Sequence, residues 1–148
     1  MFRRNLALFV LLCLTSAIDC YHFLNADQVI TPAPVDGCVA AALDSAPQVA
    51  RVKWRKHMSG LEGFELTLND STARHHRREV ALGYRTSNAQ SGELGLSTTW
   101  ALLDKPSPAE RQSIANLAAG LLRYLSERCG TGEPTPVTCR FDREALEC

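Results

Sequence analysis

The sequence predicts an α+β fold: a four-stranded antiparallel meander with two helices on one face, in the order α-β-β-β-β-α, stabilised by disulfides. Between residues 49 and 103, four consecutive segments alternate apolar and polar residues, a period typical of strands with one face in water. A short Ala-rich segment precedes them, and a long segment with a helical apolar stripe follows them. Four cysteines flank these parts.

Residues 1–19 have the layout of a secretory signal peptide. Basic Arg3 and Arg4 precede an apolar run over residues 6–14, and small residues follow. The run is about half of the roughly 20 residues that a membrane-spanning helix needs. We therefore expect an exported protein.

Cys20, the residue after this segment, leaves two alternatives open. Cleavage after Ala17 would release a soluble exported protein. In a lipoprotein-type signal, a lipid is instead attached to Cys20, which becomes the first residue. Of the six cysteines in the chain, Cys13 is lost with the signal. Lipidation of Cys20 would leave four to pair in an oxidising compartment.

Residues 20–35 are predicted to form an extended tether or arm. They show no sustained period, and Pro32 and Pro34 oppose a helix. The predicted α+β domain spans residues 36–130. It begins with a short helix that Asp36 can cap and that Pro47 ends.

The strands of the meander are expected within residues 49–57, 64–70, 78–85 and 93–103. In the first of them Val52 and Trp54 alternate with basic residues, and the same register turns Tyr84 and Trp100 inward. One face of the sheet should therefore be apolar and the other solvated.

The last predicted helix is the clearest element, with about 22 residues and a length of roughly 33 Å. Ser107 is its expected N-cap, Pro108 fits the first helical position and Glu110 completes a capping box. Gly130 is expected to end it in a left-handed conformation. The inward stripe comprises Ile114, Leu117, Ala118, Leu121, Leu122, Leu125 and Cys129.

Two disulfides are predicted from the packing of the helices. Cys38 begins the first helix and Cys129 ends the second, so antiparallel helices would bring them together. Cys139 would then pair with Cys148 and pin a C-terminal tail of residues 131–148. Four cysteines allow three connectivities, so this choice rests on packing alone.

No catalytic motif is present: the sequence lacks Gly-x-Ser-x-Gly, a phosphate-binding glycine loop and His-Glu-x-x-His. We therefore expect no enzymatic activity and no cofactor. Adjacent His75 and His76 would point to opposite faces of a strand, which favours a solvated basic turn over the alternative, a metal site. The formal net charge of zero argues against nucleic-acid binding.

The solvated sheet face is the candidate binding surface, because residues 51–85 contain eight basic and only four acidic groups. Its basic residues are Arg51, Lys53, Arg55 and Arg85. Ala81, Gly83 and Gly95 would leave a shallow patch beside them. If this face binds a partner, an anionic envelope component or a protein is expected; the alternative is a mixed charged surface that is simply solvated.

The chain as a whole resembles small bacterial envelope lipoproteins. That resemblance implies a lipid anchor through Cys20 and a periplasmic or outer-membrane-anchored location, with secretion as the alternative. Tyr21 after the anchor points to the outer membrane. The expected function is an interaction or structural module without catalysis; the alternative is a periplasmic protein that binds a metal or a small anionic ligand.

The stretch CVAAALDSAPQVARVKW, residues 38–54, resembles the helix-to-strand step of small heavy-metal-associated domains. Those domains bind copper through two cysteines. In this chain Val35 occupies the partner position of Cys38, so the resemblance does not extend to metal binding.

Overall fold

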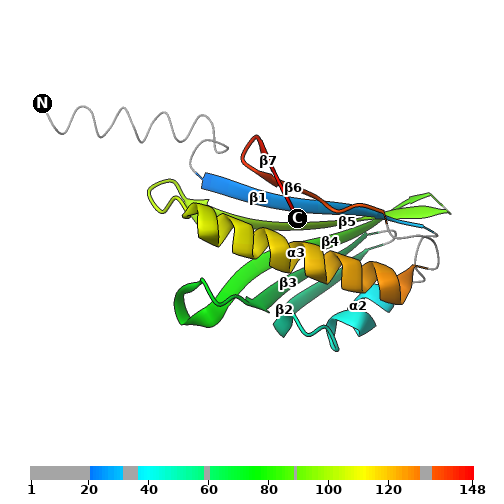
Figure 1. Cartoon of the computed structure of the whole chain (residues 1–148). Helices are drawn as coiled ribbons and strands as arrows, with labels where there is room; N and C mark the ends of the chain where they lie inside the picture. The colour runs from blue at the N-terminus through cyan, green and yellow to red at the C-terminus, as the bar shows by residue number, and fades with distance from the viewer. Residues whose placement is uncertain (1–20, 32–36, 59–60, 89, 131–134) are drawn as a thin grey trace, which may run out of the picture.

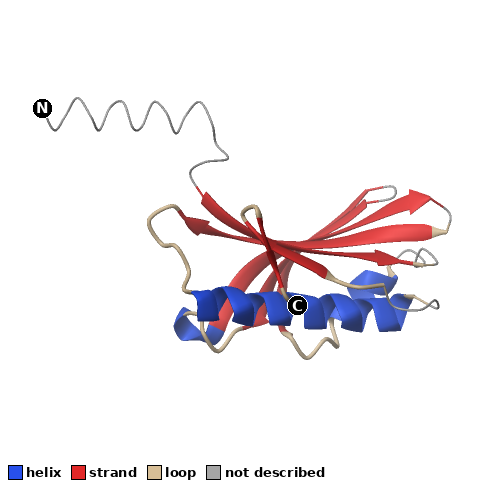
Figure 2. Cartoon of the chain, turned by 45° about the horizontal axis from the view of Figure 1, so that its top comes forward, coloured by secondary structure: helices blue, strands red, loops and turns tan. Residues whose placement is uncertain are grey.

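The computed structural model describes residues 21–31, 37–58, 61–88, 90–130 and 135–148. They form a seven-stranded antiparallel sheet with both helices on the same side (Figures 1 and 2). The strand order is β2-β3-β4-β5-β1-β6-β7. The elements are β1 (Tyr21–Ile30), α2 (Cys38–Leu43), β2 (Val49–Met58), β3 (Leu61–Asn69), a 3-10 turn η2 (Arg74–His76), β4 (Arg77–Asn88), β5 (Ser91–Ala101), α3 (Pro108–Cys129), β6 (Thr138–Phe141) and β7 (Glu144–Leu146).

The predicted α+β class and the meander are confirmed. Strands β2, β3, β4 and β5 pair consecutively and antiparallel, and Tyr84 and Trp100 lie on the buried face at 3% and 7% exposure. The predicted limit of four strands is wrong, because β1, β6 and β7 extend the sheet beyond β5.

Strand β1 corrects the prediction that residues 20–35 form a tether. It lies inside the sheet between β5 and β6, and its Leu24 and Ala26 are fully buried. The alternation is hidden in the sequence because polar Gln28 faces inward while apolar Val29 faces outward. The Gln28 Nε2 donates to the Thr135 carbonyl at 2.8 Å, whereas the buried Gln28 Oε1 has no hydrogen-bond partner among the described residues.

The C-terminal segment is also more than a tail. Strands β6 and β7 form a hairpin, and β6 pairs with β1. Cys139 and Phe141 face the core, each at 2% exposure. A strand of four residues is too short for its period to be recognised in a sequence.

Helix α2 is shorter than the predicted segment. Gly37 stands at its N-cap with φ 80°, a left-handed conformation that glycine adopts without steric cost. The predicted cap, Asp36, lies outside the described residues. As expected, the small apolar face packs inward: Val39 and Leu43 are each 1% exposed.

Helix α3 has the predicted 22 residues, with Pro108 in its first turn. The Ser107 hydroxyl accepts a hydrogen bond from the Glu110 amide at 3.2 Å. The reciprocal half of the predicted capping box is wrong, because the Glu110 carboxylate binds Arg78 and the indole nitrogen of Trp100 instead.

The predicted left-handed end at Gly130 is wrong as well, since its backbone is extended at φ −95° and ψ 156°. Glycine is needed there for space. A Cβ at this position would lie 2.7 Å from the Ser126 carbonyl oxygen and 3.1 Å from Ile30.

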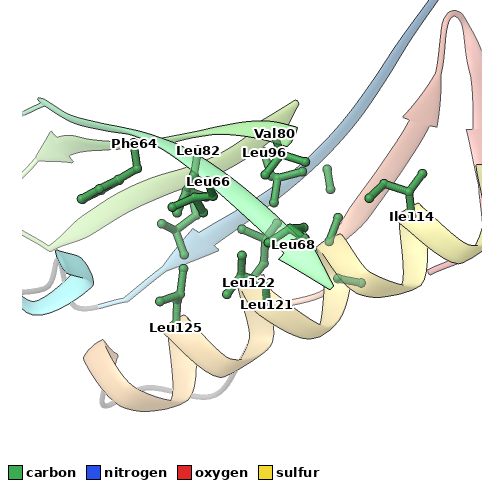
Figure 3. Close-up of a cluster of buried hydrophobic side chains, with 14 of the residues drawn as sticks. Phe64, Leu66, Leu68, Val80, Leu82, Leu96, Ile114, Leu121, Leu122 and Leu125 are labelled. Atoms are coloured by element: carbon green, nitrogen blue, oxygen red, sulfur yellow. The ribbon is translucent and has the colours of Figure 1, made fainter. Parts of the chain in front are cut away.

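The core lies between α3 and the inner sheet face. Figure 3 shows Leu121, Leu122 and Leu125 of α3 facing the apolar side chains of the strands. These three leucines are 0% exposed, as are Leu66 and Leu68 of β3. Burial of each leucine contributes about 1.5–3 kcal/mol, so this layer is the main source of stability.

Both predicted disulfides are present. Cys38 at the start of α2 is bonded to Cys129 at the end of α3, across a sequence separation of 91. Cys139 of β6 is bonded to Cys148, across a separation of 9. The first links the two helices, and the second closes the β6–β7 hairpin.

Candidate functional site

The sheet face opposite the helices carries a groove of about 880 Å³. We call it the open-face groove. It is lined by Asp27, Gln28, Val29, Leu61, Gly83, Arg85, Glu93, Leu94, Gly95, Thr135, Pro136 and Thr138. These residues come from β1, β3, β4, β5, the start of β6 and the segment that leads into it.

Two facing glycines lie in the floor of the groove, and a third extends their row beyond the groove lining. Gly83 of β4 lies directly opposite Gly95 of β5, and Gly63 of β3 continues the row on the other side of Gly83. A Cβ at Gly63 or Gly83 would meet no atom within 4 Å. The backbone is therefore bare along this row, and the space above it is open.

Apolar side chains flank the floor. Val29 and Leu61 are each 43% exposed, and both line the groove. They lie at the two ends of the cross-strand row next to the glycines. Between them in this row are Arg85, which pairs with Leu61, and Glu93, which pairs with both Arg85 and Val29. Exposed apolar side chains grouped around a hollow are typical of ligand sites.

One wall is the segment that precedes β6. The Thr135 hydroxyl donates to the Val29 carbonyl at 2.5 Å, and the Thr135 carbonyl accepts from Gln28. Two hydrogen bonds thus fix this wall to β1, and the wall continues through Pro136 to Thr138, the first residue of β6.

Asp27 is the acidic group over the floor. Its carboxylate oxygen lies 3.1 Å from the position that a Cβ of Gly95 would take. Partial burial raises the pKa of Asp27, an effect that Arg140 counteracts and Glu93 reinforces. Among the described residues, no hydrogen bond or ion pair reaches this carboxylate.

The predicted basic face is not one surface. Strand β2 shifts register between Val49 and Arg51 and again between Val52 and Trp54. Each such bulge inserts a residue and breaks the period of two. Arg55 therefore pairs opposite the buried Phe64, and its guanidinium binds Asp44 beside α2.

The other predicted basic residues are separated on the open face. Arg51 and Lys53 line a smaller hollow of about 420 Å³, whereas Arg85 lines the open-face groove. Lys53 Nζ lies 3.0 Å from a carboxylate oxygen of Glu65 and 2.7 Å from one of Glu79. Its hydrogen bond to Glu79 has the largest effect on the pKa of Lys53, the bond to Glu65 has the next largest, and both raise it. Acidic neighbours thus neutralise much of the basic excess.

His75 and His76 lie in η2, both exposed and both with positive φ, 61° and 55°. A nitrogen of the His76 ring lies 3.2 Å from the Ser71 carbonyl oxygen. Within the part of the chain that the structure describes, no group of three or more His, Cys, Asp or Glu side chains is placed to hold a metal ion.

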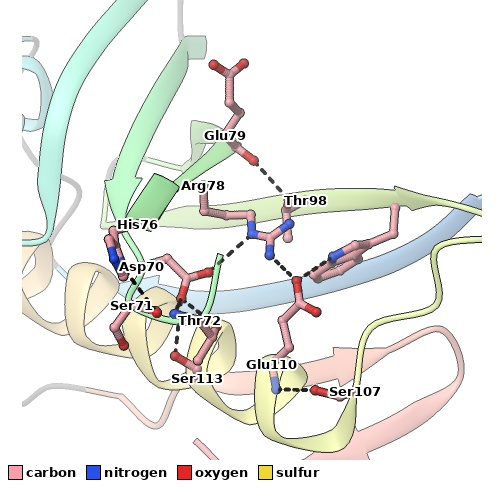
Figure 4. A network of polar contacts seen from close by, with 11 residues as sticks. Asp70, Ser71, Thr72, His76, Arg78, Glu79, Thr98, Ser107, Glu110 and Ser113 are labelled. Carbon is pink, nitrogen blue, oxygen red and sulfur yellow. Dashed lines mark hydrogen bonds and ion pairs between the residues drawn. The ribbon is translucent and has the colours of Figure 1, made fainter. Parts of the chain in front are cut away.

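Apart from the groove, a cluster of polar side chains joins the β3–β4 turn to the start of α3 (Figure 4). The fully buried Asp70 accepts from the Thr72 amide at 3.0 Å, the Thr72 hydroxyl at 2.7 Å and Arg78 at 3.3 Å. Arg78 also binds Glu110 and stacks over the Trp100 ring. Since each of these charges has its partner, the cluster is a structural anchor for α3.

The sequence indicated only part of the site. Gly83 and Gly95 were expected in a small-residue patch, and both line the groove. Asp27, Val29 and Thr135 were missed because they belong to segments that were predicted to lie outside the sheet. Cys20, the predicted lipidation site, lies outside the described residues. No described helix has the length and apolarity to cross a membrane.

The chain has a weak likeness to solved structures. No family model matches the chain, and no curated protein matches it. The Zhui aromatase/cyclase from Streptomyces sp. R1128 resembles it at a TM-score of 0.37 and 14% identity, over 71% of this chain and 92% of that one.

The di-domain ARO/CYC StfQ from the steffimycin biosynthetic pathway gives a TM-score of 0.41 and 12% identity, over 79% of this chain and 53% of that one. Both matched proteins are named as aromatase/cyclases. This contradicts the sequence-based prediction that the chain has no enzymatic activity, which is withdrawn. At these TM-scores the likeness carries no argument about a reaction, and none is assigned.

Proposed function

We propose that this chain is an exported protein of the bacterial envelope that binds a ligand with apolar surface in its open-face groove. The single observation that carries the binding role is the bare glycine row beside Leu61 and Val29. Side chains at Gly63 and Gly83 would meet nothing within 4 Å, so the fold does not require glycine there for space.

Two observations support export. The N-terminal sequence has the layout of a signal peptide. Two disulfides join the four cysteines that the structure describes, and such bridges persist in oxidising compartments. Anchoring by a lipid on Cys20 is part of the same proposal, with soluble export as its alternative.

The binding role is tested with N-phenyl-1-naphthylamine, a neutral dye that fluoresces in apolar surroundings. The full-length chain with its disulfides formed is expected to enhance the dye's emission. Gly83→Leu should abolish the enhancement, because a leucine side chain there would cover the bare floor on which the dye is proposed to lie. Thr99→Leu is the matched control, since Thr99 lies on the same face of the sheet but does not line the groove.

Circular dichroism and thermal unfolding of both variants verify that the fold is retained. Gly63→Leu serves as a second test of the same row. Dye binding by Gly83→Leu equal to that of the unchanged chain, or no binding by the unchanged chain, would overturn the proposed ligand site.

Export and anchoring are tested separately in the bacterial host. Intact mass spectrometry is expected to show loss of residues 1–19 and an acylated Cys20, and detergent-phase partitioning should disappear in Cys20→Ser. Loss of residues 1–17 without acylation would establish soluble export instead. Retention of the whole N-terminal segment would contradict export.

A further inference from the structure

We propose that the open-face groove selects a small amphipathic cation, whose flat apolar body lies on the glycine row while its ammonium group meets the Asp27 carboxylate. This inference rests on the proposed function, since it names the ligand class of the same groove. It depends on the shape of the floor and on the charges around it.

The floor accepts a flat body. Gly63, Gly83 and Gly95 lie side by side on three adjacent strands. Neighbouring strands are about 4.8 Å apart, so the row offers roughly 10 Å of bare backbone. Two fused aromatic rings fit on such a surface. Val29 and Leu61, the apolar residues in the next row, provide contact with their edges.

Asp27 lies at one end of this row. In β1 it pairs opposite Gly95, and its carboxylate lies over that glycine. No described residue donates a hydrogen bond to it or forms an ion pair with it. A ligand lying on the glycines would therefore have this carboxylate beside one of its ends.

The remaining charges favour a cation over an anion. Glu93 is already paired with Arg85 at 2.9 Å, so these two side chains nearly cancel. Arg140 acts on Asp27 electrostatically without forming an ion pair with it. The uncompensated charge within the lining is thus negative. An anion on the glycine row would face Asp27 without a free basic partner in the groove.

The titration of Asp27 agrees with this geometry. Partial burial, the largest effect, raises its pKa, because burial disfavours the charged form of a carboxyl group; Arg140 offsets part of this effect. An ammonium group beside the carboxylate would stabilise this charged form, and a charge-assisted hydrogen bond would fix its position.

Three compounds that share one ring system test the inference. They are 1-naphthylmethylamine, a cation; 1-naphthylmethanol, which is neutral; and 1-naphthoate, an anion. Each is titrated against the dye-loaded full-length chain at neutral pH. The amine is expected to displace the dye at a concentration roughly 10- to 100-fold lower than the alcohol, as hydrogen bonds to charged groups imply. The anion should be the weakest.

Asp27→Asn should remove the preference for the amine and leave the affinity for the alcohol unchanged. Asp104→Asn is the matched control, because Asp104 is an exposed aspartate outside the groove. Gly83→Leu should prevent binding of all three compounds.

Equal affinities for the amine and the alcohol in the unchanged chain, or an amine preference that survives Asp27→Asn, would overturn the inference. In both cases the proposed function would stand, provided that Gly83→Leu still blocks the dye. Tighter binding of 1-naphthoate than of the amine would also overturn the inference and would favour an anionic ligand. Failure of every compound and the dye to bind would overturn the proposed function itself.

Discussion

The fully buried carboxylate of Asp70 accepts a hydrogen bond from Arg78 Nε at 3.3 Å. Asp70 follows β3 and Arg78 belongs to β4, so this bond closes the turn between the two strands. Through its Nη2, Arg78 donates to Glu110 in the first turn of α3. A single guanidinium thus ties the sheet to the helix.

Asp70→Asn is expected to lower the free energy of unfolding by about 1–3 kcal/mol, because it weakens the buried acceptor of the hydrogen bonds from Thr72 and Arg78. Urea denaturation measures the change. The exposed Asp104→Asn should stay within about 0.5 kcal/mol of the unchanged chain. A loss no larger at Asp70 than at Asp104 would refute the anchoring role.

The same pair predicts a dependence on pH. Burial raises the pKa of Asp70, but hydrogen bonds from Thr72 and Arg78 outweigh it, and the net pKa is lowered. The ionised carboxylate therefore stabilises the fold above its unfolded pKa of about 3.9, and this contribution is lost as the pH falls through the lower folded pKa. As the pH is lowered from 6 to about 2, the free energy of unfolding should fall less steeply for Asp70→Asn than for the unchanged chain. An unaltered slope in the variant would show that Asp70 does not contribute to the acid sensitivity.

The two disulfides should contribute different amounts to the free energy of unfolding. The Cys38–Cys129 bridge spans 91 positions and the Cys139–Cys148 bridge only 9. The loop-entropy relation then gives about 4–5 kcal/mol for the first and about 2.5–3 kcal/mol for the second. Denaturation of the Cys38→Ser/Cys129→Ser and Cys139→Ser/Cys148→Ser double variants measures both. The reverse order would contradict this account of the linkage.

Two glycines on neighbouring strands should respond in opposite ways to substitution. Gly83→Ala is expected to stabilise the protein by about 0.5–1 kcal/mol, because its new methyl group meets open space. Gly92→Ala should destabilise it by about 1–3 kcal/mol, since its Cβ would lie 2.4 Å from the buried ring of Tyr84. Thermal unfolding of both variants distinguishes them, and destabilisation by Gly83→Ala would show that the floor is not open.

Removing a basic residue from β2 should leave ligand binding unchanged. Lys53 pairs with exposed Glu65 and Glu79 outside the open-face groove, so Lys53→Met is expected to leave the fold intact, because exposed ion pairs contribute little to stability. Its affinity for N-phenyl-1-naphthylamine should equal that of the unchanged chain. A loss of dye binding would move the site to the smaller hollow beside Lys53.

The sequence was most informative where the chain repeats a pattern over many residues. The 22 residues of α3 carry a clear apolar stripe and a Ser-Pro start, and the four meander strands alternate clearly. The helix-end cysteines then identified both bridges. Each of these predictions depends on a periodic pattern within one segment, or on how two such segments pack together.

The missed features depend on tertiary context. Strand β1 was missed because Gln28 faces inward, where its Nε2 donates to the carbonyl of Thr135 from more than a hundred residues away. The bulges in β2, which separate Arg55 from Lys53, leave the sequence pattern apparently regular. The groove required β1 beside β5, a long-range pairing that a local period cannot reveal.

The central claim, that ligands bind on the helix-free face of the sheet, is tested most directly by amide chemical-shift mapping. 1-Naphthylmethanol is titrated into the isotopically labelled full-length chain. The largest shifts are expected at Asp27, Gly83 and Gly95. Shifts concentrated on α3 or beside Lys53, with those three amides unmoved, would contradict the claim.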